Sequence, residues 1–220
     1  MYSRTKLSIN GIFKFTVTIL NSPGGYPTIC GGLQDRGNGS TMTDLCYQYA
    51  PEVDTWFESG RLQTSRNSYG YDYSDSWGLI MTGGYRLYPS PITRPLDSVE
   101  VTKDGFNFET YQPMPERRAL HCTAVVDDDR LIVAGGTTGG IAPSASAYMY
   151  SKLEDSWTRL SDMVTGRLYM SCRTITNQET GELEVIVPGG AGLEPGLYLS
   201  SVEIYNVQSG SWRVAGKCSN

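Results

Sequence analysis

The chain has 220 residues, which is enough for one large all-β domain. Its 18 Lys and Arg residues against 23 Asp and Glu residues give a formal net charge of −5, so we expect neither a nucleic-acid partner nor a membrane partner. His121 is the single histidine, and no CxxC or HExxH pattern occurs, which excludes the common zinc and non-haem iron sites; we expect no metal and no cofactor.

Residues 1–20 contain Arg4 and Lys6, followed by an apolar-leaning run, LSINGIFKFTVTIL. The run can be a weak secretory signal peptide, or it can be the innermost strand of a first β unit, in which Phe13 and Phe15 share one face. We favour the strand. No run in the chain reaches the roughly 18 apolar residues of a transmembrane helix.

A short β-rich run ends in a pair of glycines four times along the chain. The first glycines, at positions 31, 83, 135 and 189, are 52, 52 and 54 residues apart. A fixed period of this length is typical of repeat architectures. The four pairs are Gly31-Gly32, Gly83-Gly84, Gly135-Gly136 and Gly189-Gly190.

A large aromatic residue follows each diglycine after 22 to 25 residues, and in three of the four units a tyrosine lies seven residues before it. We expect these rings to lie on neighbouring strands and to fill the space between units. In the second unit Phe108 takes the place of Trp, and Thr102 takes the place of Tyr. The other members of the set are Tyr49, Trp56, Tyr150, Trp157, Tyr205 and Trp212.

Each period contains about four short extended runs, and no window has the periodicity and caps of a helix, so the chain is predicted to be all-β. A four-stranded unit of about 50 residues cannot bury both of its faces alone, and stacking around an axis solves this in a propeller. In the second unit the runs are 67–73, 77–82, 98–102 and 106–110, and the same set recurs from Leu120 and from Tyr169.

The order of diglycine, strand ending in Tyr, Trp, and Pro- or Arg-bearing turn resembles the kelch repeat, best in segments 114–136, 147–157 and 201–212. The resemblance implies one domain, 1–220, folded as a kelch-type β-propeller with four four-stranded antiparallel blades. The expected blades are 12–60, 61–112, 113–163 and 164–215.

Kelch propellers usually close with six or seven blades, so we expect four repeats to make a partial or open ring. The chain is then a fragment, closes unusually, or completes its ring with another chain. Open blade faces are a pairing hazard, and we expect an isolated chain to associate with itself.

Five cysteines are an odd number, so at least one is free or is paired between chains. Cys30 and Cys46 fall on neighbouring antiparallel strands and can form a disulfide or remain buried thiols. Cys122 and Cys172 occupy the same register in successive units, where strands are usually too far apart to bridge, so we expect buried thiols. A secreted and a cytoplasmic location both stay open.

Candidate chemistry in the chain has simpler interpretations. We interpret Asp127 to Asp129 as a solvated hairpin turn rather than a metal site, and His121 as a structural residue or a polar wall of the central channel rather than a general base. No nucleophile elbow or phosphate-binding loop occurs in a suitable setting. We therefore expect a non-enzymatic module; the alternative is a secreted glycan-binding or degenerate galactose-oxidase-like propeller.

Two sets of loops emerge on one face in this architecture, and variable loops on a rigid scaffold usually carry binding. The loops after the diglycines are 33–44, 85–97, 137–144 and 191–199. Because Arg and Tyr are frequent in binding hot spots, we expect a protein or peptide partner to contact this face. The alternative, that the arginines bridge blades, stays open. The candidate residues are Arg66, Arg86, Tyr88, Arg117, Arg118 and Arg167.

Overall fold

The computed structural model describes residues 12–14, 26–35, 40–87, 93–140, 142–194 and 196–217. Within these ranges all regular secondary structure is β-strand, which confirms the all-β prediction. No helix in the described part of the chain has the length and hydropathy needed to cross a membrane.

Three antiparallel sheets of four strands form the second, third and fourth blades, in the order in which the chain runs. The second blade is β7 (Gly70–Ser74), β8 (Gly78–Thr82), β11 (Val99–Thr102) and β12 (Glu109–Tyr111). The third is β13 (Cys122–Val125), β14 (Arg130–Ala134), β15 (Ala147–Ser151) and β16 (Ser156–Arg159). The fourth is β17 (Arg173–Thr176), β18 (Leu183–Pro188), β19 (Ser201–Asn206) and β20 (Ser211–Lys217).

The first blade shows three strands in the described residues: β2 (Thr28–Cys30), β5 (Leu45–Ala50) and β6 (Thr55–Arg61). Most of the run expected to form its innermost strand lies outside the described residues. The described part, β1 (Ile12–Lys14), pairs with β3 (Leu33–Asp35), which follows the first diglycine.

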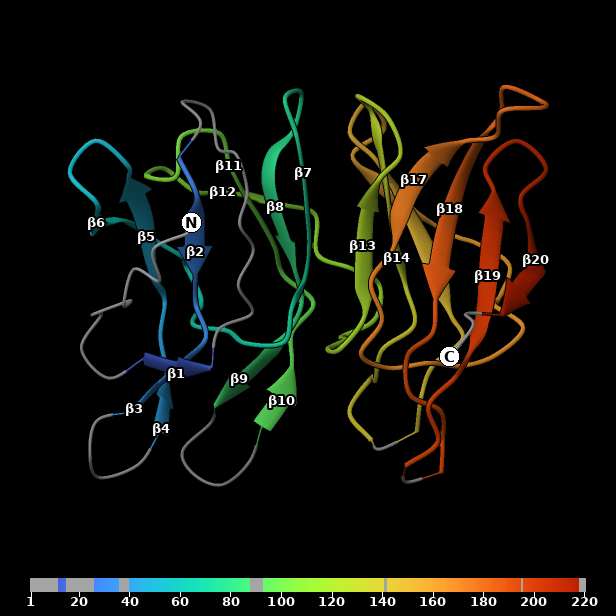
Figure 1. The fold of residues 1–220 in the computed structure, drawn as a ribbon, viewed down its shortest axis with the longest axis horizontal. Coiled ribbons are helices and arrows are strands. Elements are labelled where there is room, and N and C mark those ends of the chain that lie inside the picture. Colours follow the sequence, from blue (N-terminus) through green and yellow to red (C-terminus); the bar gives the residue numbers. More distant parts are fainter. Residues whose placement is uncertain are drawn as a thin grey trace, which may run out of the picture.

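The blades follow one another across the molecule in chain order, from β6 on one side to β20 on the other (Figure 1). Side chains alternate between the two faces of each strand, so each inner blade offers an apolar face to both neighbours. Between the second and third blades this core contains Ile80, Val99, Val101, Leu131, Val133 and Tyr148. Between the third and fourth it contains Ala124, Ile132, Ala134, Val185 and Val187.

The repeated Tyr and Trp residues are direct cross-strand partners within their blades. The ring centroids of Tyr150 and Trp157 are 5.2 Å apart, and those of Tyr205 and Trp212 are 5.1 Å apart. The Trp212 indole Nε1 donates to the carbonyl of Ser161 at 2.9 Å, at the end of the third blade. The aromatic pair therefore links its own blade to the preceding one.

In each of the first three diglycines, the second glycine makes the same contact with the next blade. The amides of Gly32, Gly84 and Gly136 donate to the carbonyls of Arg66, Arg118 and Arg167 at 2.8, 2.9 and 2.9 Å. Gly84 has a φ of +92°, and a Cβ there would lie 2.6 Å from the Asn67 carbonyl oxygen, so only glycine fits. The regular spacing of the diglycines thus corresponds to a backbone hydrogen bond that is repeated between successive blades.

The described residues contain two disulfides. Cys30 and Cys46 are paired across β2 and β5 with Cα atoms 4.1 Å apart, which confirms the disulfide alternative. Cys122 and Cys172 are also bonded, with Cα atoms 5.6 Å apart. The expectation of buried thiols at that pair was wrong, because the innermost strands β13 and β17 of neighbouring blades contact each other at the axis.

Candidate functional site

The loop face is the end of the molecule that carries the loops after the diglycines and the segments that start each blade. It comprises segments 31–35, 40–44, 62–69, 83–87, 93–97, 112–121, 135–146, 160–172 and 189–200, within the described residues. Two of its loops form hairpins, one of β3 with β4 (Ser40–Met42) and one of β9 (Tyr85–Leu87) with β10 (Thr93–Pro95). Both hairpins lie at the lower end in Figure 1.

Arg66 starts the second blade and is fully buried. Its guanidinium donates to the Gly83 carbonyl at 2.9 Å and to the Ser98 hydroxyl at 2.8 Å, and it pairs with the buried Glu100 carboxylate. The same carboxylate accepts the amide of Gln63 at 2.6 Å. Burial lowers the pKa of Arg66, and Glu100 opposes that shift. The charge pair is therefore satisfied inside one blade.

Arg167 repeats this arrangement in the fourth blade. It donates to the Gly189 carbonyl at 2.7 Å and pairs with the buried Glu203 carboxylate at 2.5 Å. Glu203 also accepts the amides of Val164 and Thr165 at 2.6 and 2.9 Å. The repetition in two separate blades indicates a structural unit.

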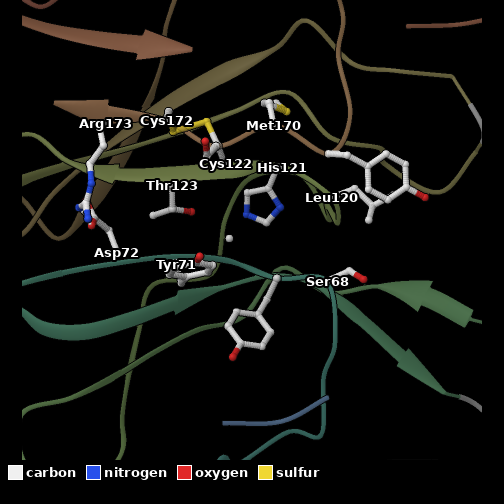
Figure 2. Close-up of a pocket in the computed structure, with 14 residues that line it drawn as sticks. Ser68, Tyr71, Asp72, Leu120, His121, Cys122, Thr123, Met170, Cys172 and Arg173 are labelled. Atoms are coloured by element: carbon white, nitrogen blue, oxygen red, sulfur yellow. Dashed lines mark hydrogen bonds and ion pairs between the residues drawn. A yellow bond between two sulfur atoms is a disulfide. The ribbon is translucent and has the colours of Figure 1, made fainter. Parts of the chain in front are cut away.

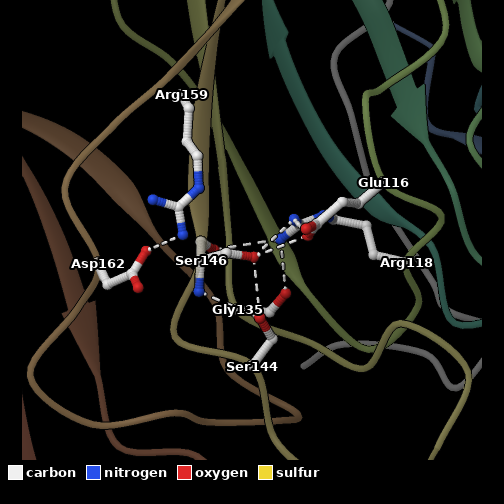
Figure 3. Close-up of polar contacts among 7 residues, drawn as sticks. All are labelled: Glu116, Arg118, Gly135, Ser144, Ser146, Arg159 and Asp162. Atoms are coloured by element: carbon white, nitrogen blue, oxygen red, sulfur yellow. Dashed lines mark hydrogen bonds and ion pairs between the residues drawn. The ribbon is translucent and has the colours of Figure 1, made fainter.

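Arg118 uses a variant of the same unit in the third blade (Figure 3). It donates to the Gly135 carbonyl at 2.8 Å and the Ser146 hydroxyl at 2.9 Å. Tyr148 occupies the position that a buried glutamate has in the second and fourth blades, and its ring centroid lies 5.3 Å from the guanidinium. Arg118 instead forms an ion pair with Glu116 at 3.0 Å. Burial lowers the pKa of Arg118, and Glu116 opposes the shift.

The partner-contacting role expected of Arg66, Arg118 and Arg167 does not agree with these positions. Each has 0% of its side chain exposed, and each guanidinium binds carbonyl and carboxylate groups of its own blade. The alternative, that the arginines bridge blades, holds in part: the guanidiniums do bind carbonyls and carboxylates, but within their own blade, and only the backbone carbonyl of each arginine bonds to the preceding blade. A residue type common in binding sites is here used for its five rigidly arranged donors.

Arg86 and Arg117 remain on the exposed loop face. Arg117 pairs with Asp97 at 3.3 Å, and both side chains are solvent-accessible. Arg86 lies on β9, directly opposite Arg94 on β10. Tyr88 lies outside the described residues. The sequence analysis did not select Arg94. The signal available for it was that Arg86 and Arg94 flank one loop that contains proline.

A pocket of about 560 Å³ lies where β7, β13 and β17 come together at the axis (Figure 2). His121 stands in its wall, nearly fully buried, with Nε2 2.7 Å from the Thr82 hydroxyl. Burial holds the pKa of His121 well below its usual value, and the charges of Arg118 and Arg66 add to this. A neutral, hydrogen-bonded imidazole agrees with the structural interpretation.

Asp72 joins three blades at the same pocket. From β7 its carboxylate accepts the Val125 amide of the third blade at 2.8 Å and pairs with Arg173 of the fourth. Burial raises the pKa of Asp72, although the Val125 amide and the Arg173 charge act in the opposite direction. With the Cys122–Cys172 disulfide beside it, this ion pair fixes the fourth blade at the axis.

The acidic turn has the local structure expected from its residue types. Asp127 accepts the amides of Asp129 and Arg130 at 3.0 and 2.7 Å and pairs with the Arg130 side chain. Burial acts to raise the pKa of Asp127, but these hydrogen bonds outweigh it and lower the pKa. The described residues contain no group of three or more His, Cys, Asp or Glu side chains placed to hold a metal.

Three non-glycine residues at the pocket mouth share an unusual backbone conformation. Ser68, Leu120 and Tyr169, each two positions after a buried arginine, have φ values of +51°, +58° and +57°. The Leu120 amide donates to Ser68 at 2.9 Å, and the Tyr169 amide donates to Leu120 at 3.0 Å. The Tyr169 side chain is 70% exposed. Sequence reasoning could not find this feature, because it depends on backbone torsions.

The stacked four-stranded sheets define a β-propeller fold, and comparison with a solved structure agrees. The structure of YjhT matches 88% of this chain and 68% of its own, with a TM-score of 0.69 and 12% identity. At that identity the likeness shows the fold.

Sequence comparisons specify the repeat. The family model described as Kelch motif matches residues 118–164. An F-box/kelch-repeat protein of Arabidopsis thaliana is 31% identical over 111 residues, which are 49% of this chain and 28% of the relative. The match thus spans about a quarter of that relative's length. Residues 118–164 therefore match a kelch motif, in a chain that has a propeller fold.

Proposed function

We propose that the chain is a non-enzymatic module that binds another protein or a peptide through its loop face. The observation that carries this proposal is the exposure of large apolar and aromatic side chains on a rigid scaffold. Tyr198 and Leu193 are 83% and 65% exposed in the loop after the last diglycine. Such side chains are enriched at interfaces, where their burial stabilises a complex.

The scaffold beneath the loops supports this use. Buried arginine units, diglycine hydrogen bonds and two disulfides fix the ends of the loops, so a partner meets a preorganised surface. The name of the plant relative also places a kelch-repeat region beside a different module, an F-box. A kelch-repeat chain used as a binding part of a larger protein agrees with the proposal.

A random peptide library displayed on phage, selected against the purified chain, tests the proposal. We expect selected peptides to lose binding when Tyr169 and Tyr198 are replaced by Ser. Matched controls are Val53→Ser and Leu153→Ser, which remove exposed apolar side chains from hairpins between the two outer strands of their blades. Peptides whose binding depends on the control positions, or a library that yields no binders, would reject the loop face.

A further inference from the structure

Each of the first three diglycines receives the segment that starts the following blade, which we call the entry segment. An apolar side chain of that segment, four residues before the buried arginine, fills the space beside the first glycine. A Cβ on Gly135 would lie 2.8 Å from the Arg167 carbonyl oxygen and 3.1 Å from the Met163 side chain. Leu62 and Met114 take the place of Met163 at the other two diglycines. We call this contact a blade joint.

A second backbone hydrogen bond completes the blade joint, two residues after the arginine. The Leu120 amide donates to the Ser68 carbonyl of the preceding blade at 2.9 Å, and the Tyr169 amide donates to the Leu120 carbonyl at 3.0 Å. The second glycine supplies the other bond by donating to the arginine carbonyl. A preceding blade thus offers one amide and one carbonyl, and the entry segment answers both with its main chain.

The fourth blade carries the same groups without an entry segment. Among the described residues a Cβ on Gly189 would meet a single atom within 4 Å, the Leu199 carbonyl oxygen at 3.3 Å. Within the same part of the chain, the Gly190 amide has no acceptor and the Tyr169 carbonyl has no donor. The fourth blade therefore presents a complete but unused blade joint.

Apolar side chains beside this unused joint lack the cover that their counterparts have. The residues one and three positions before a diglycine lie on the face toward the following blade. In the third blade these are Ala134 and Ile132, which are 0% exposed in the core against the fourth blade. In the fourth blade Pro188 and Ile186 hold the same positions on β18, and both are only partly buried. Covering them would remove apolar surface from water.

The first blade has the opposite face uncovered, the one that docks on a preceding blade. Tyr47 on β5 pairs with the residue two positions before its diglycine, as Tyr148 and Glu203 do in the third and fourth blades. Tyr148 and Glu203 are 6% and 0% exposed, and Tyr148 belongs to the core against the preceding blade. Tyr47 is only partly buried. The two ends of the chain thus expose the two halves of one kind of interface.

The first blade also has an entry segment in the position that the other blades use. Lys14 on β1 pairs with Leu33, the residue directly after the first diglycine. Ala119 in the third blade pairs in the same way with Thr137, directly after its own diglycine. The main chain of the first blade is therefore placed as in the entry segments that form blade joints.

We infer that the fourth blade of one copy of this chain binds the first blade of a second copy, head to tail. The entry segment of the second copy pairs with the Gly190 amide and the Tyr169 carbonyl, and its first blade covers Ile186 and Pro188. An interface between two different faces is heterologous, so it closes into a ring or extends into a filament according to the rotation between copies. This surface is separate from the proposed partner surface, and the inference does not depend on the proposed function.

Sedimentation velocity over a range of concentrations tests the fourth-blade half of the interface. All proteins carry Cys218→Ser, which excludes disulfides between copies through that cysteine. Gly189→Ala places a Cβ in the space that an entry segment would fill, and we expect the Kd of association to rise at least about tenfold. Gly181→Ala is the matched control and should leave Kd unchanged, because both glycines have a positive φ, +60° and +75°, and no described atom lies within 4 Å of a Cβ on Gly181.

Mixing two blocked variants tests the head-to-tail arrangement. Tyr47→Lys buries a charge in the first-blade half and should weaken self-association as Gly189→Ala does, whereas Val53→Lys, at an exposed position of the same blade, should not. Gly189→Ala and Tyr47→Lys should nevertheless bind each other, because one keeps the first blade intact and the other keeps the fourth. Fluorescence energy transfer between copies labelled at their amino termini detects this pairing.

The outcomes that would overturn the inference are distinct. If Tyr47→Lys associates normally while Gly189→Ala does not, the fourth blade binds something other than the first blade. A mixture without energy transfer, or an unaltered chain that is a monomer at all concentrations, would also overturn it. Near-ultraviolet circular dichroism checks the fold of each variant, and Ile186→Glu on the same face replaces Gly189→Ala if that variant does not fold.

Discussion

Cys122 and Cys172 join the innermost strands of two successive blades, with their Cα atoms 5.6 Å apart and a sequence separation of 50. The bond lies beside the Asp72–Arg173 ion pair, so the fourth blade is held at the axis by one covalent and one electrostatic link. The ion pair brings together residues 101 positions apart in the chain.

Removal of this disulfide should lower stability strongly. We expect Cys122→Ala/Cys172→Ala to lose about 4 kcal/mol of unfolding free energy and Cys30→Ala/Cys46→Ala about 3 kcal/mol, because the first bond closes the longer loop. Urea unfolding of the oxidised proteins measures both. Thiol titration in denaturant, before reduction, should find one thiol among the five cysteines; five titratable thiols would show that the bonds do not form.

Removal of either side chain of the buried Arg167–Glu203 ion pair should strongly destabilise the protein. We expect Glu203→Gln and Arg167→Ala each to cost about 3 to 5 kcal/mol, because the remaining charge stays buried without compensation. Arg159→Ala breaks an exposed pair with Asp162 and should cost far less, because solvent screens that pair. Equal losses for the two arginines would contradict the structural role of Arg167.

His121 should resist protonation while the protein is folded. Its folded pKa lies well below that of the unfolded chain, so the stability it contributes is present above about pH 6.5 and lost as pH falls below it. We expect stability to fall by about 1 kcal/mol between pH 7.5 and 5.5, and by less in His121→Gln. The single imidazole is readily followed by NMR, and a midpoint near 6.5 in the folded protein would contradict the prediction.

The free face of the fourth blade should promote self-association. Among the described residues the Gly190 amide has no acceptor, whereas the three preceding diglycines each donate to a following arginine. Ile175 is exposed on β17. We expect light scattering after size exclusion to give a mass above that of one chain, reduced by Ile175→Glu and unaffected by Leu153→Glu. A monomer at all concentrations would contradict this.

The repeat and its fold could be predicted from the sequence because the glycine and aromatic spacings have a direct structural cause. Gly84 must approach the Asn67 carbonyl, and Trp157 must face Tyr150, so their intervals are fixed by geometry. The Cys30–Cys46 disulfide could be considered from the sequence for the same reason, since adjacent strands place the two cysteines opposite each other.

The proposed binding surface was harder to predict from the sequence, because the identity of an arginine does not determine whether its side chain is exposed. Arg66 and Arg118 both lie 17 residues before a diglycine, and such strict register is typical of a structural residue. Arg94 gave no such regularity. Its position opposite Arg86 follows from the register of β9 with β10, which the sequence does not specify.

The buried arginine units have a consequence for how such chains change over time. The guanidinium of Arg66 meets its carbonyl, hydroxyl and carboxylate partners within one blade, and only its backbone carbonyl reaches the neighbour. Duplication or deletion of a blade therefore leaves no Arg66-type guanidinium without its carboxylate, because both partners belong to the same repeat. The number of such repeats can change by gene duplication while each arginine keeps its partners, whereas the Asp72–Arg173 pair ties the second blade to the fourth.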